Sequence, residues 1–173
     1  AMKERDIICN YLDMPLQHAA NNMLKAMKRQ ITREEMEELI VAVRSTVPGI
    51  CLRTTLIAGF PGETEDDVEE LKGFLQQQRF DRVGIFTYSH EEGTSAYDLT
   101  DGVPAEEKER RAQEIMETQQ EISLELNQEK VGKVFKTLID KKEAGRYLGR
   151  TEFDSVEVDN EVVIHSAKKL PIG

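Results

Sequence analysis

The sequence has no tryptophan and only two cysteines among its 173 residues. The two cysteines lie far apart in the sequence, so no metal site can be built from them. Cys9 and Cys51 each lie in a β-like apolar run, and we expect both to be buried free thiols. No apolar stretch approaches the roughly 20 residues needed to cross a bilayer, and the first residues contain no apolar signal region. The sequence therefore predicts a cytoplasmic protein with no membrane partner.

Basic side chains are also scarce relative to acidic ones, at 23 against 33, which gives a net charge of -10. The surplus lies almost wholly in residues 1–130, because acidic and basic side chains nearly balance from residue 131 onward. Such a surface repels nucleic-acid phosphates and steers a cationic partner toward it. Ordinary solubility is the other interpretation of the surplus.

Periodicity predicts an alternation of strands and helices over residues 1–130. The expected elements, in order, are a strand at 7–13, a short helix at 22–28, a helix opened by Thr32, a strand at 50–58, a helix opened by Thr64, a strand at 82–88 and a long helix at 104–130. Glu35 and Asp67 stand three residues after the two threonines, which is the pattern of a capping box or N-cap. This order predicts an α/β fold with a parallel sheet covered by helices.

Beyond residue 130 the pattern changes to short strands, expected at 134–139, 147–150, 156–158 and 162–165. About 40 residues are few for a closed five-stranded barrel. We therefore expect a second, all-β piece that is incomplete at its C-terminal end.

The segment from Leu56 to Thr64 joins a hydrophobic strand to a helix through a glycine turn. Ligands of α/β sheets collect at such strand ends, and Gly59 and Gly62 allow close approach to the backbone. Carboxylates crowd the first turn of the helix, so a nucleoside triphosphate fits poorly and an adenosine without phosphate fits better. A plain strand-to-helix turn remains the alternative interpretation.

Arg53, Thr55 and Ile57 have period-two spacing, so their side chains point to one face of the expected strand. Polar groups on an inner face indicate a ligand cavity, unless Arg53 simply pairs with a carboxylate across the sheet. His18, by itself, is more typical of a hydrogen-bonded residue than of a ligand, and we assign it no catalytic role.

Several stretches resemble radical S-adenosylmethionine methylthiotransferases over nearly the whole chain: YLDMPLQH, LKAMKRQITREE, LRTTLIAGFPGETEDD, FDRVGIFTYSHEEGTSAYDL and QQEISLELNQEKVGK. The resemblance implies that residues 1–130 are the C-terminal half of an open (βα) radical-SAM, TIM-like barrel with parallel strands. Residues 131–173 would be a partial all-β TRAM domain, which is OB-like. The chain would then be a C-terminal fragment.

YLDMPLQH and the tail GRTEFDSVEVDNEV are similar to the branch of this family that acts on a ribosomal protein. In that branch an aspartate of the twelfth small-subunit ribosomal protein receives a methylthio group. A basic ribosomal protein agrees with the acidic surface, and nucleic acid is disfavoured as the direct substrate. A fragment of the tRNA-modifying branch and a non-enzymatic binding module that reuses the fold are the alternatives.

The resemblance implies S-adenosylmethionine and two 4Fe–4S clusters as cofactors of the intact enzyme, with a 5′-deoxyadenosyl radical removing hydrogen from the substrate carbon. The cluster motif C-x-x-x-C-x-x-C is absent from this sequence. We therefore expect no metal ligands, no catalytic residues and no activity in this chain alone. By position, the family's cofactor contacts fall on Ile57, Gly59, Phe60, Pro61, Gly62, Phe86, Thr87 and Tyr88, and more weakly on Gln17, Arg53 and Arg29.

A half-barrel exposes the edge of its first strand, here expected at Ile7–Asp13. Unpaired backbone groups at such an edge can template another strand. We therefore expect the isolated chain to self-associate.

Overall fold

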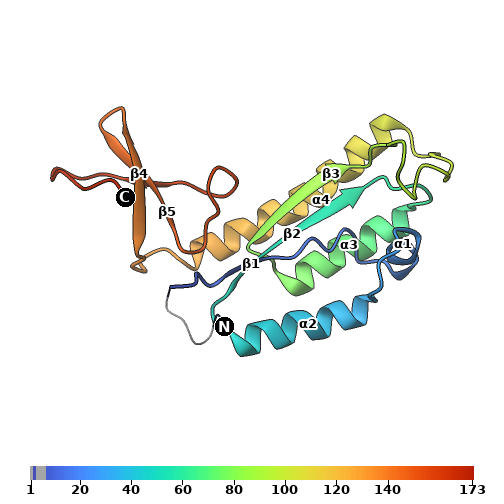
Figure 1. Ribbon diagram of the computed structural model, residues 1–173, viewed down its shortest axis with the longest axis horizontal. Helices are drawn as coiled ribbons and strands as arrows, with labels where there is room; N and C mark the ends of the chain where they lie inside the picture. The colour runs from blue at the N-terminus through green and yellow to red at the C-terminus, as the bar shows by residue number, and fades with distance from the viewer. Residues whose placement is uncertain (1, 3–6) are drawn as a thin grey trace.

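The computed structural model describes residues 2 and 7–173, and they form two sheets with four helices (Figure 1). The elements are β1 (Tyr11–Asp13), α1 (Asn21–Ala26), α2 (Arg33–Thr46), β2 (Cys51–Ala58), α3 (Glu65–Gln78), β3 (Arg82–Thr87), α4 (Ala105–Gln128), β4 (Thr137–Glu143), β5 (Arg146–Thr151) and β6 (Val162–Ile164). No helix in this part of the chain is long and apolar enough to cross a membrane.

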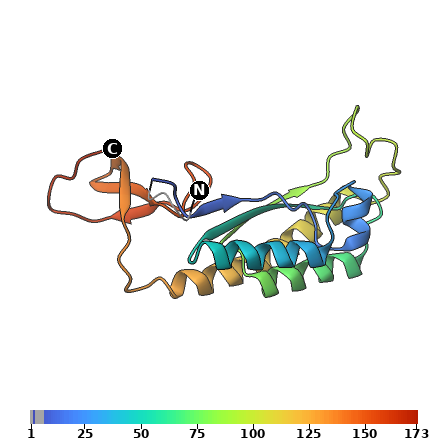
Figure 2. The ribbon, with the colours of Figure 1, turned by 60° about the horizontal axis from the view of Figure 1, so that its bottom comes forward.

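The first sheet has the order β1-β2-β3, and both of its pairs are parallel. Figure 2 shows α2, α3 and α4 on one face of this sheet, and within the described residues the opposite face carries no helix. The predicted α/β fold with parallel strands is confirmed. The second sheet has the order β4-β5-β6 and is antiparallel, as expected for the all-β piece.

The core lies between the first sheet and its helices. Leu52 and Leu56 point from β2 into this layer, where they meet Met36, Leu71 and Phe74, all fully buried. The alternation along β2 places every second side chain in the core and leaves the intervening ones partly exposed. Among the described residues, no helix covers the face that carries these partly exposed side chains.

Both predicted helix starts are confirmed. Thr32 and Glu35 form a capping box at α2, and Thr64 and Asp67 form another at α3, with each side chain accepting from the other's backbone N–H. These reciprocal bonds satisfy two of the backbone donors that a helix leaves free at its start. The second box fixes the point at which the glycine turn after β2 becomes a helix.

The first strand is shorter than predicted. β1 covers Tyr11–Asp13, while residues 7–10 lie outside it and Ile7 is 88% exposed. The register explains the difference, because Tyr11 pairs with Cys51, the first residue of β2, and residues farther upstream have no strand beside them. The prediction that Cys9 is buried was therefore wrong, whereas Cys51 is buried.

Two expected strands of the second sheet also differ. The first begins at Thr137 rather than at residue 134, and Val134 is almost fully exposed. Residues 156–158 form a turn instead of a strand, with Glu157 in the left-handed region. The Asp159 carboxylate holds this turn by accepting from the Ser155 backbone N–H at 2.8 Å. A local side-chain bond thus outweighs the β preference of valine.

Side-chain contacts join the two sheets at the end where β1, β2 and β3 begin (Figure 1). Asp159 accepts from the Tyr11 hydroxyl at 2.8 Å, and its other oxygen lies 3.7 Å from Arg53 Nε. Asp154 pairs with Arg82 at 2.9 Å. The loop between β5 and β6 therefore rests on the amino end of the first sheet.

Candidate functional site

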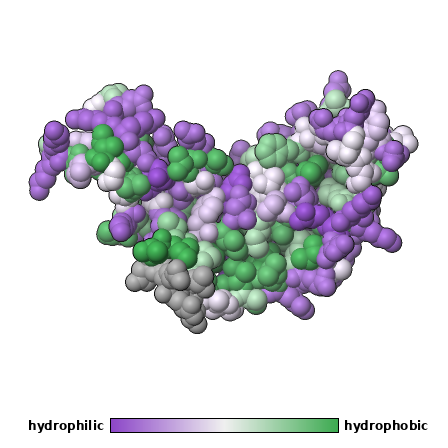
Figure 3. Space-filling model, in the orientation of Figure 1, coloured by the Kyte–Doolittle hydropathy of each residue, from purple (hydrophilic) through white to green (hydrophobic). Residues whose placement is uncertain are grey.

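The carboxyl end of the first sheet carries most of the predicted site. Ile57 on β2 is the register partner of Phe86 on β3, so their side chains lie next to each other on the face without helices. Phe86 is 61% exposed, and Ile57 is half-buried. Figure 3 shows apolar side chains gathered at the centre of the molecule, beside β1. An exposed aromatic ring on a sheet face offers a surface on which a planar ligand can stack.

Gln17 extends this end of the sheet by its backbone. Its N–H donates to the Thr55 carbonyl at 2.9 Å, and its carbonyl accepts from the Ile57 N–H at 2.8 Å, although Gln17 itself has a φ of 75°. Gln17 therefore lies directly beside Ile57, as the prediction of a shared site requires. Arg29 is tied to the preceding segment, where its guanidinium donates to the Pro15 carbonyl at 2.9 Å.

The turn after β2 has the predicted glycine geometry. Gly59 and Gly62 have φ values of 77° and 87°, a region that favours glycine. A Cβ on Gly59 would lie 2.2 Å from Lys108 Cγ, whereas a Cβ on Gly62 would meet nothing within 4 Å. Gly59 and Pro61 are buried, and Gly62 is exposed. Gly62 is thus the one glycine of this turn that a ligand can approach from solvent.

Phe60 and Tyr88 form the wall behind this turn. Phe60 is buried, and its ring meets the Tyr88 ring edge-on with centroids 5.1 Å apart. Lys108 Nζ lies 5.0 Å from the centre of the Tyr88 ring. Burial, together with the Asp101 and Glu91 carboxylates, raises the pKa of the Tyr88 phenol, which therefore stays neutral at physiological pH.

Two predicted contacts do not lie on the open face at this end, Thr87 because of its direction and Arg53 because of its distance. Thr87 follows Phe86 on an alternating strand, so its side chain points toward the helices rather than the open face. Arg53 lies six residues before Gly59, roughly 20 Å away along an extended strand. Arg53 pairs with Asp13 on β1 at 2.6 Å, which confirms the alternative that it binds a carboxylate across the sheet.

A buried charged cluster underlies the glycine turn. Glu63 Oε2 accepts from the Gly59 N–H at 2.8 Å and from the Arg111 guanidinium at 3.0 Å, and the two side chains are 0% and 9% exposed. His18 Nδ1 accepts from the Ala20 N–H at 2.9 Å, so the neutral ring carries its proton on Nε2, which faces Glu63 Oε1 at 3.3 Å. His18 is a buried, hydrogen-bonded residue, as expected.

Sequence reasoning missed Arg111 and Lys108, since both reach the turn from α4, far along the chain. Glu63 could have been found, because a carboxylate directly after Gly62 in a buried turn needs a partner. Arg111 also donates to the Glu63 carbonyl at 2.8 Å, so it holds both the side chain and the backbone of that residue. Burial lowers the pKa of Arg111, but its bonds to Glu63 and Glu107 outweigh this and raise it overall.

The described residues do not fit an iron–sulfur cluster. Among them no group of three or more histidine, cysteine, aspartate or glutamate side chains is placed to hold a metal ion. The Cys51 thiol donates to the Phe153 carbonyl at 3.4 Å, and burial raises its pKa to about 12, so it stays protonated. Cluster ligation requires thiolates.

Comparisons with known proteins identify two domains in the chain. A model of the radical SAM superfamily matches residues 1–75, and a TRAM domain model matches residues 131–173. The solved structure of coproporphyrinogen III oxidase (HemN) from Escherichia coli, a radical SAM enzyme, covers 65% of this chain with a TM-score of 0.57 and 20% identity. This structural likeness supports the expected radical-SAM barrel fold. The matched region is 27% of the coproporphyrinogen III oxidase chain.

Curated relatives are much more similar in sequence. Ribosomal protein uS12 methylthiotransferase RimO from Flavobacterium psychrophilum is 56% identical over 96% of this chain, which spans 39% of that relative. RimO from Bacteroides thetaiotaomicron is 52% identical over 99% of this chain, which spans 40% of that relative. The chain therefore belongs to the radical S-adenosylmethionine methylthiotransferase family, in the RimO branch, and it spans about 39% of the length of the curated relatives it matches.

Proposed function

We propose that this chain supplies the adenosine-binding and substrate-docking elements of a radical S-adenosylmethionine methylthiotransferase that modifies an aspartate of ribosomal protein uS12. The observation that carries the proposal is the identity of 56% with a protein named uS12 methylthiotransferase, together with an open sheet face at the predicted cofactor contacts. Residues 1–130 would form the C-terminal half of the barrel, and residues 131–173 would form part of the TRAM domain.

The adenosine would lie on the face without helices, with its base against Phe86 and Ile57. The exposed ring of Phe86 offers a stacking surface, and Gly62 leaves room for close approach to the turn. Phe60 and Tyr88 would shape the turn from behind rather than contact the base. The acidic first turn of α3 disfavours a phosphate at this point. S-adenosylmethionine, when bound here, would supply the radical chemistry that the family carries out.

The two 4Fe–4S clusters would be ligated by residues other than those described, because the cysteines of this chain do not suit them. The role left to this chain is to bind and orient. Its surplus of acidic side chains favours a basic ribosomal protein over nucleic acid as the partner. Such a partner places the proposed function in the cytoplasm.

The test uses the whole enzyme that contains this chain, with clusters reconstituted under anaerobic conditions, S-adenosylmethionine, a reductant and purified uS12. We expect the mass increase that corresponds to replacing one hydrogen of a single aspartate with a methylthio group. The Phe86→Ala variant should raise the KM for S-adenosylmethionine about tenfold, which corresponds to about 1.4 kcal/mol of lost stacking. Val41→Ala, an exposed apolar change on α2, is the control.

Modification of tRNA instead of uS12 would reject the proposed substrate. If the whole protein contains no cluster-binding cysteines, the hypothesis of a non-enzymatic binding module replaces that of an enzyme. For the isolated chain, we also propose self-association through the edge of β1, with which no strand pairs among the described residues. Light scattering at high concentration checks it, and a single monomeric species would contradict it.

A further inference from the structure

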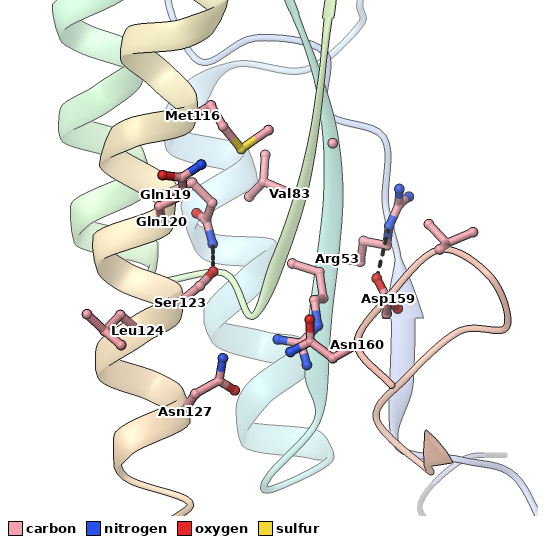
Figure 4. A pocket seen from close by; sticks show the side chains of 13 residues that line it. Arg53, Val83, Met116, Gln119, Gln120, Ser123, Leu124, Asn127, Asp159 and Asn160 are labelled. Carbon is pink, nitrogen blue, oxygen red and sulfur yellow. Dashed lines mark hydrogen bonds and ion pairs between the residues drawn. The ribbon is translucent and has the colours of Figure 1, made fainter. Parts of the chain in front are cut away.

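A cavity lies at the opposite end of the sheet from the glycine turn. It has a volume of about 470 Å³ and runs between β3, α4 and the loop that contains Asn160 (Figure 4). We define the edge groove by Arg82, Gly84, Gln119, Ser123, Asn127 and Asn160, which line it. β3 pairs with β2 on one side, and within the described residues no strand pairs with its other side. The groove thus follows a free sheet edge.

Two buried polar atoms of the edge groove have no hydrogen-bond partner among the described residues. Gln119 is 2% exposed, and its Nε2 donates to the Phe80 carbonyl at 2.9 Å and to Ser123 Oγ at 3.0 Å. These two bonds fix the orientation of the amide and leave Oε1 as an acceptor without a donor. Arg82 Nε is likewise a donor without an acceptor. Buried polar groups without partners are costly, so a ligand that satisfies both would be stabilised.

The charges at the edge groove are already compensated. Arg82 pairs with Asp154 at 2.9 Å, and Arg53, which also lines the cavity, pairs with Asp13 at 2.6 Å and approaches Asp159. The carboxylates beside both guanidinium groups disfavour a phosphate or another anion. The remaining polar side chains are neutral amides and a hydroxyl. The groove therefore suits an uncharged ligand that offers both a donor and an acceptor.

We infer that the edge groove binds an extended polypeptide segment beside β3. A peptide group carries one N–H and one C=O, which match the free Gln119 Oε1 and Arg82 Nε, and an extended chain can add to a free sheet edge. This inference rests on the proposed function for the identity of the polypeptide, which would be a segment of uS12. The site lies away from the adenosine end, so it docks the substrate without contacting the reacting atoms.

The probes are overlapping peptides that cover uS12, labelled for fluorescence polarisation and titrated into the 173-residue chain. We expect at least one peptide to bind. The Asn127→Trp variant places a large ring in the groove and should weaken binding at least tenfold. Gln128→Trp, which introduces the same ring at the next, exposed position of α4, should leave peptide binding unchanged. Gln119→Leu should also weaken binding, with the exposed Gln113→Leu as its control.

Circular dichroism of each variant tests whether it is folded, and Asn127→Trp keeps the inference testable if Gln119→Leu unfolds. Equal binding to wild type and Asn127→Trp, no binding of any peptide, or displacement of the peptides from the groove by tRNA would each overturn the inference. The whole enzyme separates the two proposals. If the Asn127→Trp enzyme modifies uS12 with an unchanged KM for uS12, only the inference about the groove is rejected. If the enzyme modifies tRNA instead while peptide binding still depends on the groove, only the proposed substrate is rejected.

Discussion

At the carboxyl end of the first sheet, main-chain bonds and glycines shape the site, whereas at the amino end charged side chains join the sheet to the second one. Gln17 and the Gly59–Gly62 turn are positioned by backbone conformation. Arg53, Arg82 and Asp159 act through contacts between residues far apart in the chain. The carboxyl end, where we propose the cofactor site, is thus built mainly from short, local sequence. The amino end, where we propose docking, depends on how the two sheets pack.

The largest expected effect tests whether the carboxyl end depends on charge as well. Arg111→Met leaves the buried Glu63 carboxylate without its cation, and an unpaired buried charge costs about 3 kcal/mol or more. We expect a corresponding loss in the free energy of unfolding, measured with urea. Arg110→Met is the matched control, because the neighbouring Arg110 pairs with glutamates on an exposed surface and should matter little. Equal losses in both variants would show that Glu63 does not depend on Arg111.

A smaller expected effect distinguishes backbone strain from steric collision at the glycine turn. Gly59→Ala adds left-handed strain and a Cβ that collides with Lys108, so we expect a loss of about 3 kcal/mol. Gly62→Ala adds the same kind of strain in open space and should cost about 1 kcal/mol. Thermal or urea unfolding of both variants measures the difference. If the two losses are equal, Lys108 moves aside and the close packing at Gly59 contributes nothing.

The same contrast explains what could be predicted from the sequence. Thr32 and Thr64 each have their capping partner three residues away, and the glycine turn lies within a single segment, so local patterns suffice. The prediction that the first strand begins at Ile7 fails because a strand needs a neighbour. β2 begins at Cys51, beside Tyr11, so no strand lies beside Ile7. Residues 156–158 have strand-forming side chains, but Asp159 bonds back to Ser155 and makes a turn.

The predicted site follows the same rule. Ile57 and Phe86, both named from the resemblance, lie side by side because their strands are adjacent in a parallel sheet. Arg111 was missed, since nothing near it in the sequence points to Glu63. The edge groove was missed as well, because Gln119 on α4 and Asn160 in the second sheet come together only in the folded chain. Contacts over long sequence separation remain outside what periodicity and motifs reveal.

The smallest expected effect concerns Asp159, which links the amino end of the first sheet to the second. Asp159→Asn should cost about 1 kcal/mol of stability, because it weakens the hydrogen bond from Tyr11 and removes the ion pair with Arg53 but keeps an acceptor for the Ser155 N–H. Asp140→Asn, which alters a pair with Arg150 in the exposed β4–β5 hairpin, is the control.

A pH titration sharpens this prediction. Burial, followed by the hydrogen bond and charge of Asp159, raises the pKa of the Tyr11 phenol above its ordinary value of 10.0. The folded state thus holds this proton more tightly than the unfolded state, so the stabilisation is full below about pH 10 and is lost as the pH rises beyond it. Asp159→Asn should lower the pKa of Tyr11 without restoring the ordinary value, since burial remains. Tyrosinate absorbance, compared with that of Tyr11→Phe to identify the signal, measures the shift. An unchanged Tyr11 titration in Asp159→Asn would mean that the loop does not rest on the sheet in solution, and the edge groove would then lose the wall that Asn160 provides.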